Sequence, residues 1–176
     1  MGDGGKNAVS ESADRVIWLL DKGASSGFSS LDWRYSPLEE IMQIRESGGL
    51  TGEQYEEFRR QVNSLVTKGQ NPVLLRRYIL ECSNLFEEAP SNGAWWACWK
   101  RSAIQFFNDE YISLDSVLPG LAEGDLADID DVIEDIMDLS PLLDSADIPD
   151  WVPASHSWWW RLSDGGAYIP DLIEGG

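Results

Sequence analysis

The sequence predicts an all-α protein, a bundle of about six helices followed by an irregular, Trp-rich C-terminal tail. Apolar residues recur at spacings of three and four over most of the chain, which is the periodicity of amphipathic helices. Residues that favour helix starts and helix stops flank several of these segments. Of the 176 residues, 43% are apolar and nine are Trp, so the chain can build a packed core.

The first third of the chain is predicted to hold two helices joined by a loop. Residues 1–9 are rich in Gly, and we expect them to form a disordered N-terminus. A helix is predicted over residues 10–22, with a Ser as its cap and Gly23 as its stop. After a Ser/Gly-rich loop, Ser36-Pro37-Leu38-Glu39 matches a capping box with Pro at the first helical position. This box opens a helix that runs to about residue 47.

Two further helices are predicted in the middle of the chain. Thr51 and Gln54 form a second capping box, and apolar residues keep helical spacing after it as far as Gly69. Asn71-Pro72 opens a fourth helix, which Pro90 is expected to end because Pro cannot continue the backbone hydrogen bonds.

The last part of the chain is less regular. A fifth helix, rich in Trp and Phe, is predicted over residues 93–108, and a sixth, strongly acidic helix over residues 125–139. Residues 148–176 hold three prolines and a run of Trp, and they predict an irregular segment with a short hairpin at Gly165-Gly166 as an option. We expect this segment to pack on the acidic helical domain formed by residues 10–147.

Charge is the strongest functional signal, because it is divided unevenly. The net charge of −18 consists of −2 from residues 1–101 and −16 from residues 102–176, where Arg161 is the one basic residue against 17 acids. Acidity of this kind excludes nucleic acid and anionic membranes as direct partners of the second half. It favours a basic protein, whose approach long-range attraction would accelerate. General solvation of the surface is the alternative interpretation.

The sequence also predicts the cellular location of the protein and the state of its two cysteines. The longest purely apolar runs are a few residues, so no transmembrane helix is predicted. No basic region followed by an apolar stretch opens the chain, so no secretory signal is predicted either. Cys82 and Cys98 each lie on an apolar helix side, which predicts buried thiols instead of a redox pair. We therefore expect a cytoplasmic protein with free thiols and without a cofactor.

Two short strings are similar to catalytic motifs but lack their context. Residues 23–27 match the G-x-S-x-G of a nucleophile elbow, for which His156, the single His, could serve as base. A helical pattern precedes this string where the elbow needs a strand, so a flexible loop is favoured. Residues 130–135 match a DDxx(E/D) string that holds Mg²⁺ in terpene and prenyl synthases, but those enzymes also need a second metal motif and basic diphosphate contacts.

The sixth helix carries the candidate partner-binding surface. Its acids fall near one side, while Ile129, Ile133 and neighbouring apolar residues can anchor the other side to the core. Three consecutive Trp residues cannot all face one interior, so at least one of residues 158–160 is expected to be exposed. Exposed Trp is enriched among the residues that dominate protein interfaces. The predicted contact residues are Asp128, Asp131, Glu134, Asp135, Asp138, Trp158, Trp159 and Trp160.

Part of the first half is similar to a known family. Residues 41–58 combine a helix, a Gly-containing turn and the string T-x-E-x-aromatic-E-E-F, and residues 72–90 form a following helix that ends in L-F-E-E-A-P. This arrangement over residues 37–90 resembles the colicin D immunity-like family of bacterial toxin-immunity proteins. The resemblance implies an inhibitor that fills the cationic active site of a nuclease toxin with carboxylates.

The favoured interpretation is therefore a bacterial immunity protein or antitoxin that is not an enzyme and that neutralises a basic partner. A phage-encoded acidic mimic of nucleic acid, which blocks a host defence or DNA-binding protein, uses the same physics against another target. A small helical enzyme that holds a metal ion with carboxylates is an alternative from a different class.

Overall fold

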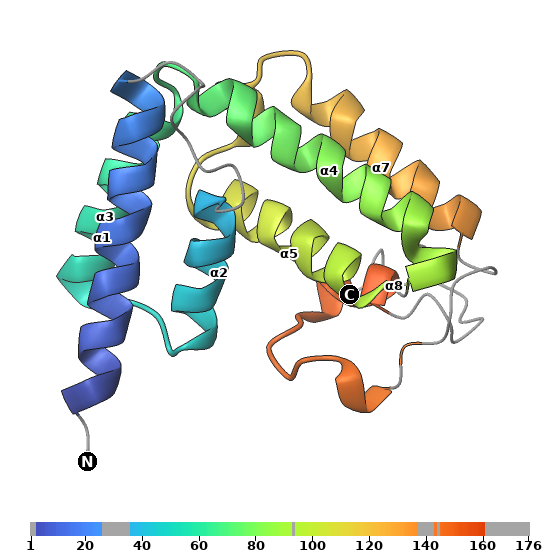
Figure 1. Cartoon of the computed structure of the whole chain (residues 1–176), viewed down its shortest axis with the longest axis horizontal. Helices are drawn as coiled ribbons and strands as arrows, with labels where there is room; N and C mark the ends of the chain where they lie inside the picture. Colours follow the sequence, from blue (N-terminus) through green and yellow to red (C-terminus); the bar gives the residue numbers. More distant parts are fainter. Residues whose placement is uncertain (1–2, 26–35, 93, 137–142, 144, 161–176) are drawn as a thin grey trace, which may run out of the picture.

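The computed structural model describes residues 3–25, 36–92, 94–136, 143 and 145–160, and these residues form an all-α fold without strands (Figure 1). The longer helices, in chain order, are α1 (Asp3–Ser25), α2 (Pro37–Glu46), α3 (Gly52–Val66), α4 (Asn71–Asn92), α5 (Trp95–Glu110) and α7 (Ala122–Ile136). The short elements are α6 (Leu114–Val117), the 3-10 helices η2 (Ser145–Asp147) and η3 (Ala154–His156), and α8 (Ser157–Trp160). The predicted fold class is confirmed.

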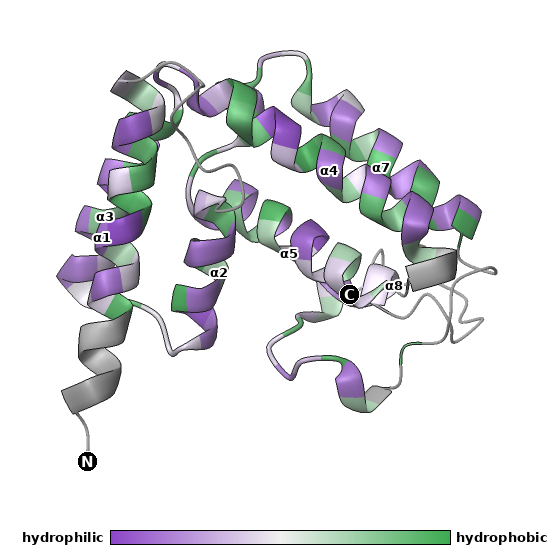
Figure 2. Ribbon diagram, viewed as in Figure 1, coloured by the Kyte–Doolittle hydropathy of each residue, from purple (hydrophilic) through white to green (hydrophobic). Residues whose placement is uncertain are grey.

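The helices pack as two groups that share one core. In Figure 1, α1 lies against α2 and α3, while α4 lies against α5 and α7. Contacts of α2 with α5 and of α1 with α4 join the groups, and buried side chains from every long helix form a single apolar cluster. Figure 2 shows hydrophilic and hydrophobic residues alternating around α4 and α7, as expected for helices that bury one side.

The turn between α3 and α4 is fixed by two residues that reach α1. Gly69 has a φ of 57°, and a Cβ built there would lie 2.5 Å from the carbonyl oxygen of Ala24, so only glycine fits. Buried Asn71 donates from Nδ2 to the carbonyl oxygens of Leu20 and Leu65, each at 2.8 Å. Asn71 therefore satisfies carbonyl groups near the C-terminal ends of α1 and α3.

The two predicted capping boxes have different outcomes. Ser36 caps α2, because its hydroxyl accepts a hydrogen bond from the backbone N–H of Leu38 at 3.2 Å. Glu39 does not complete the box, since its carboxylate lies 3.6 Å from the Lys100 ammonium instead. Thr51 makes no side-chain cap bond at the start of α3, so the second box is absent even though the helix begins where the sequence predicted.

Several helix boundaries differ from the prediction. α1 begins at Asp3, within the residues expected to be disordered, because extending an existing helix is far easier than starting one. α4 continues two residues past Pro90, α7 starts at Ala122, and the short α6 was not predicted. The option of a hairpin at residues 165–166 falls outside the described residues.

Candidate functional site

The carboxylates of α7 fall into two groups, and the first group faces the protein. Buried Asp125 accepts two hydrogen bonds from Arg76 of α4, at 2.9 and 3.2 Å. Asp130 accepts two from Arg101 of α5, at 3.0 and 3.2 Å. Paired bonds of this geometry fix orientation as well as charge. The two pairs therefore hold α7 on α4 and α5 in one rotational setting.

Arg101 is the more deeply placed of the two arginines. Its side chain is 5% exposed, it also donates to the Gln105 side chain at 3.1 Å, and its guanidinium lies 4.6 Å from the centre of the Trp159 ring. A buried cation of this kind depends on its carboxylate partner. Asp130 consequently serves the fold, although the sequence places it in the same acidic run as its exposed neighbour.

The second group of α7 carboxylates faces solvent. Asp128, Asp131, Glu134 and Asp135 are exposed, and no cation among the described residues lies within ion-pairing distance of any of them. On the opposite side of the helix, Ile129, Ile133 and Ile136 are buried, as predicted. Asp138, the remaining predicted acid, lies outside the described residues. The exposed acids span about 10 Å of helix axis and repel one another by a few tenths of a kcal/mol per adjacent pair.

Exposed apolar residues lie on the helix beside this acidic row. α4 and α7 run side by side in the same direction (Figure 1), and Arg76 of α4 marks the flank that faces α7. Leu80 follows Arg76 by one turn and is 44% exposed, and Val73, seven residues before Leu80, is 54% exposed. The sequence could have predicted this exposure, because both residues are apolar but neither belongs to the apolar side of α4.

The three consecutive Trp residues divide between surface and core. Trp158 is half-buried, whereas Trp159 and Trp160 are buried. Trp159 and Trp160 are therefore not available at the surface as the predicted contact set assumed, because the turn of α8 carries their indoles against α5. There, the Nε1–H groups of Trp159 and Trp160 donate to the hydroxyl of Ser102 at 3.1 and 2.9 Å. Contact of Trp158 with a partner stays a prediction.

The Trp residues of α5 are arranged largely as their spacing predicted. Trp99 is buried, Trp95 is half-buried, and Trp96 is 44% exposed at the edge. The rings of Trp96 and Trp99 stack with centroids 4.8 Å apart and an interplanar angle of 7°. Trp96 is thus an exposed aromatic side chain held rigid by its neighbours, a feature that the predicted contact set omitted.

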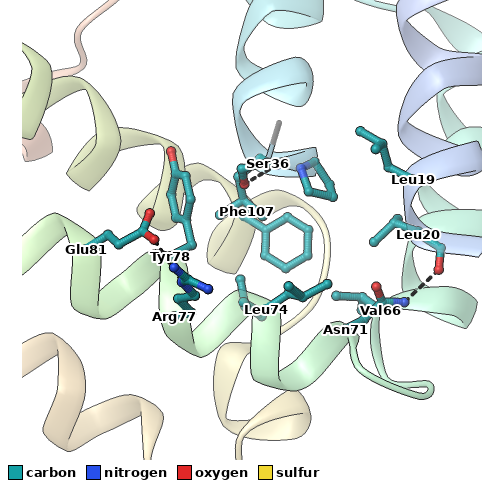
Figure 3. Close-up of a pocket in the computed structure, with 13 residues that line it drawn as sticks. Leu19, Leu20, Ser36, Val66, Asn71, Leu74, Arg77, Tyr78, Glu81 and Phe107 are labelled. Atoms are coloured by element: carbon teal, nitrogen blue, oxygen red, sulfur yellow. Dashed lines mark hydrogen bonds and ion pairs between the residues drawn. The ribbon is translucent and has the colours of Figure 1, made fainter. Parts of the chain in front are cut away.

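A small apolar pocket opens between α1, α2 and α4 (Figure 3). Its volume of about 60 Å³ is too small for a drug-sized ligand, whose sites measure roughly 300–1,000 Å³. Tyr78 and Glu81 line its polar end, where the Lys100 ammonium lies 4.2 Å from the Tyr78 ring and 3.5 Å from Glu81. Burial raises the pKa of Glu39, the second carboxylate at Lys100. We interpret this cluster as an internal ion-pair network.

A wider hollow of about 370 Å³ lies between α2, α3 and the end of α5. Tyr55, Tyr111 and Trp151 line it, together with Arg45 and Glu110, whose side chains form an ion pair with each other. Because these two charges neutralise one another, the hollow presents no net charge to a ligand. The hollow is therefore not a second candidate for the acidic binding surface.

The described residues do not place the two strings that are similar to catalytic motifs in the geometry that those motifs require. Ser25 ends helix α1, so no strand leads into it as a nucleophile elbow requires. Among the described residues, no group of three or more His, Cys, Asp or Glu side chains is arranged to hold a metal ion. Cys82 and Cys98 are buried, as predicted. Burial raises the pKa of the Cys82 thiol to about 12, and it also raises the pKa of the Cys98 thiol well above its ordinary value.

No family model, curated protein or solved structure matches this chain. None of the helices in the described part of the chain is sufficiently long and apolar to cross a membrane.

Two adjacent acids of α7 allow a direct test of the division between inward and exposed carboxylates. Replacing Asp130 with alanine leaves the Arg101 cation buried without its partner, and we expect a loss of about 2–3 kcal/mol in the free energy of unfolding. This value is lower than for a fully buried pair because the Asp130 side chain is 34% exposed. Asp131→Ala is the matched control and should change stability by about 0.5 kcal/mol or less. Equal urea-unfolding midpoints for the two variants would contradict the assignment.

Proposed function

We propose that this protein is an acidic inhibitory binding protein, an immunity protein or antitoxin, that neutralises a basic partner through the exposed carboxylates of α7. The observation that carries this proposal is the row formed by Asp128, Asp131, Glu134 and Asp135, which we call the acidic row. Its members have no cation partner among the described residues, whereas Asp125 and Asp130 on the same helix do. A basic partner would supply the missing cations and relieve the mutual repulsion.

The scaffold around the acidic row supports a binding role. Arg76 and Arg101 fix the rotation of α7, so the row is presented in one orientation before a partner arrives. Preorganisation of this kind lowers the entropic cost of association. Leu80 and Val73 of the neighbouring helix α4 add apolar surface that a partner can cover. Apolar anchors surrounded by charge are characteristic of strong interfaces.

The proposed partner is a nuclease toxin whose active site is cationic because it binds a polyanionic substrate. Four negative charges along one rigid helix can occupy such a site in place of phosphate groups. The resemblance of residues 37–90 to the colicin D immunity-like family points to the same class of target. Of the helices of the resemblance, α4 packs directly against α7, and α7 makes the proposed contact.

The proposal is tested by capturing the partner and measuring inhibition. The full-length chain, immobilised at one terminus, should retain a basic protein from the cells in which it is made, and a large toxin gene should lie beside its own gene. The purified partner should degrade RNA or DNA, and one equivalent of this protein should abolish that activity. Capture of a phage target, such as a host defence or DNA-binding protein, would favour the acidic mimic instead.

A metal-dependent enzyme is the alternative from a different class, and calorimetry separates it. Titration of the chain with Mg²⁺, Mn²⁺ or Ca²⁺ should give weak, non-stoichiometric heats if the acidic row acts only as a binding surface. Tight, stoichiometric binding would favour the enzyme.

Association with the partner should depend steeply on salt. The Debye length falls from ~10 Å at 0.1 M salt to ~3 Å at 1 M, so attraction between an acidic surface and a basic partner is screened. We expect the association rate constant to fall about tenfold or more over this range, within the span that electrostatic steering covers. Stopped-flow rates that stay constant would show that the acidic row does not steer association.

A further inference from the structure

Two side chains of α5 form hydrogen bonds with the C-terminal segment, residues 151–160. The Cys98 thiol donates to the carbonyl oxygen of Trp159 at 2.8 Å, and the Ser102 hydroxyl contacts three ring nitrogens. The side chain of Ser102 is fully buried, and its oxygen lies 3.1 Å from Nε1 of Trp159, 2.9 Å from Nε1 of Trp160 and 3.2 Å from Nδ1 of His156. Three ring nitrogens of one segment therefore meet at one side chain of another helix.

The hydrogen-bonding capacity of a hydroxyl determines the proton positions in this cluster. An indole N–H can only donate, so the two indoles occupy both lone pairs of the Ser102 oxygen. The one proton of the hydroxyl then points to Nδ1 of His156, which must accept it. The imidazole is consequently neutral, with its proton on Nε2.

Protonation of His156 makes this arrangement of donors and acceptors impossible. Nδ1 becomes a donor, and three donors then face an oxygen with two lone pairs. One buried donor loses its partner and the hydroxyl proton loses its acceptor, while a positive charge is placed between the aromatic rings of Phe106 and Trp159, 4.7 and 4.6 Å from the imidazole. Unpaired buried polar groups and buried charges are costly, so protonation of His156 strongly disfavours the closed cluster.

The geometry points to a pH-sensitive latch, in which Ser102, His156 and the two indoles hold the C-terminal segment on α5 at neutral pH and release it in acid. The buried indoles of Trp159 and Trp160 would then become exposed.

The charged groups around His156 favour the same response. From α5, Arg101 lies over the Trp159 ring, and from α2, Arg45 lies 3.7 Å from the centre of the Phe106 ring. Both cations oppose a further positive charge, although Asp130 of α7 pairs with Arg101, and Asp109 of α5 acts in the opposite sense. Burial is the largest cause and Arg101 the next, and together they lower the pKa of His156 from 6.5 to about 4.

The sign and size of the effect follow from these two pKa values. Above pH 6.5, His156 is neutral in the docked and in the released segment, so pH has no influence through it. Between pH 6.5 and 4, only the released segment binds a proton, so the ratio of docked to released chains falls about tenfold per pH unit. The full loss, reached near pH 4, is on the order of 10²-fold.

Nuclear magnetic resonance of the full chain tests the latch, because His156 is the single His and the indole protons give separate signals. The matched variant is His156→Asn, whose side-chain oxygen can accept the Ser102 proton but does not titrate. In the unmodified chain, protection of the Trp159 and Trp160 indole protons against solvent exchange should fall by up to ~10²-fold between pH 6.5 and pH 4. In the variant it should stay nearly constant.

Two results would overturn the latch. Equal loss of protection in both proteins would assign the release to carboxylate titration, and full protection in the unmodified chain at pH 4 would show that no release occurs. If the His156→Asn variant fails to dock the C-terminal segment even at neutral pH, the test uses the unmodified chain alone. The signals of its His156 ring and of its indole protons are then followed as the pH is lowered. Titration of His156 below pH 6 together with loss of indole protection supports the latch, and titration near pH 6.5 without that loss overturns it.

Discussion

Replacing Ser102 with alanine is expected to lower the free energy that holds the C-terminal segment on α5 by about 3–5 kcal/mol. The substitution leaves three buried ring nitrogens, on His156, Trp159 and Trp160, without their common partner. Each unsatisfied buried group costs about 1–3 kcal/mol, and small shifts of the rings recover part of the sum. No large cavity forms, because only one oxygen atom is removed.

Hydrogen exchange at neutral pH measures this loss. The backbone N–H of His156, which donates to the carbonyl oxygen of Pro153 at 2.9 Å, should lose protection by a factor of about 10²–10⁴. Ser116→Ala is the matched control, since Ser116 is exposed on α6 and should change protection little. A Ser102→Ala chain with the same protection as the control would show that the serine does not fasten the segment.

The second large effect concerns binding and follows from the acidic row. Reversing Asp131 and Asp135 to lysine removes two of its four charges and places two cations opposite the basic partner. Changes to charge pairs that are buried in an interface cost about 2–5 kcal/mol of affinity. The fold should survive, because both residues are exposed and neither belongs to the ion pairs with Arg76 and Arg101.

The helices were predictable from sequence because their signals are local. Caps, stops and apolar spacing depend on neighbouring residues, so α2 to α5 and the apolar side of α7 appear close to where they were expected. The start of α1 was missed because the Gly residues near the N-terminus suggested disorder, whereas elongation from the following helix extends to Asp3.

Local spacing in the sequence does not show which carboxylates of α7 face the protein and which face solvent. Asp130 and Asp131 are adjacent and chemically identical, and only the position of Arg101 on another helix makes one internal and the other exposed. The placement of Trp159 and Trp160 likewise depends on Ser102, a residue more than fifty positions away that has no distinguishing sequence context. Long-range partners of this kind determine which members of a charged or aromatic run remain available for function.

The central claim, that the acidic row binds a basic partner, is tested most directly by titration calorimetry of the captured partner with two charge-matched variants. Asp131→Lys/Asp135→Lys alters the row, and Glu53→Lys/Glu56→Lys makes the same change in net charge at exposed positions on α3. Circular dichroism should first show that both variants retain the helical fold. The account predicts that the α7 variant loses about 2–5 kcal/mol of binding free energy while the α3 variant binds nearly as the unmodified chain does. Equal affinities for the two variants would contradict it, because net charge alone, and not the surface of α7, would then govern association.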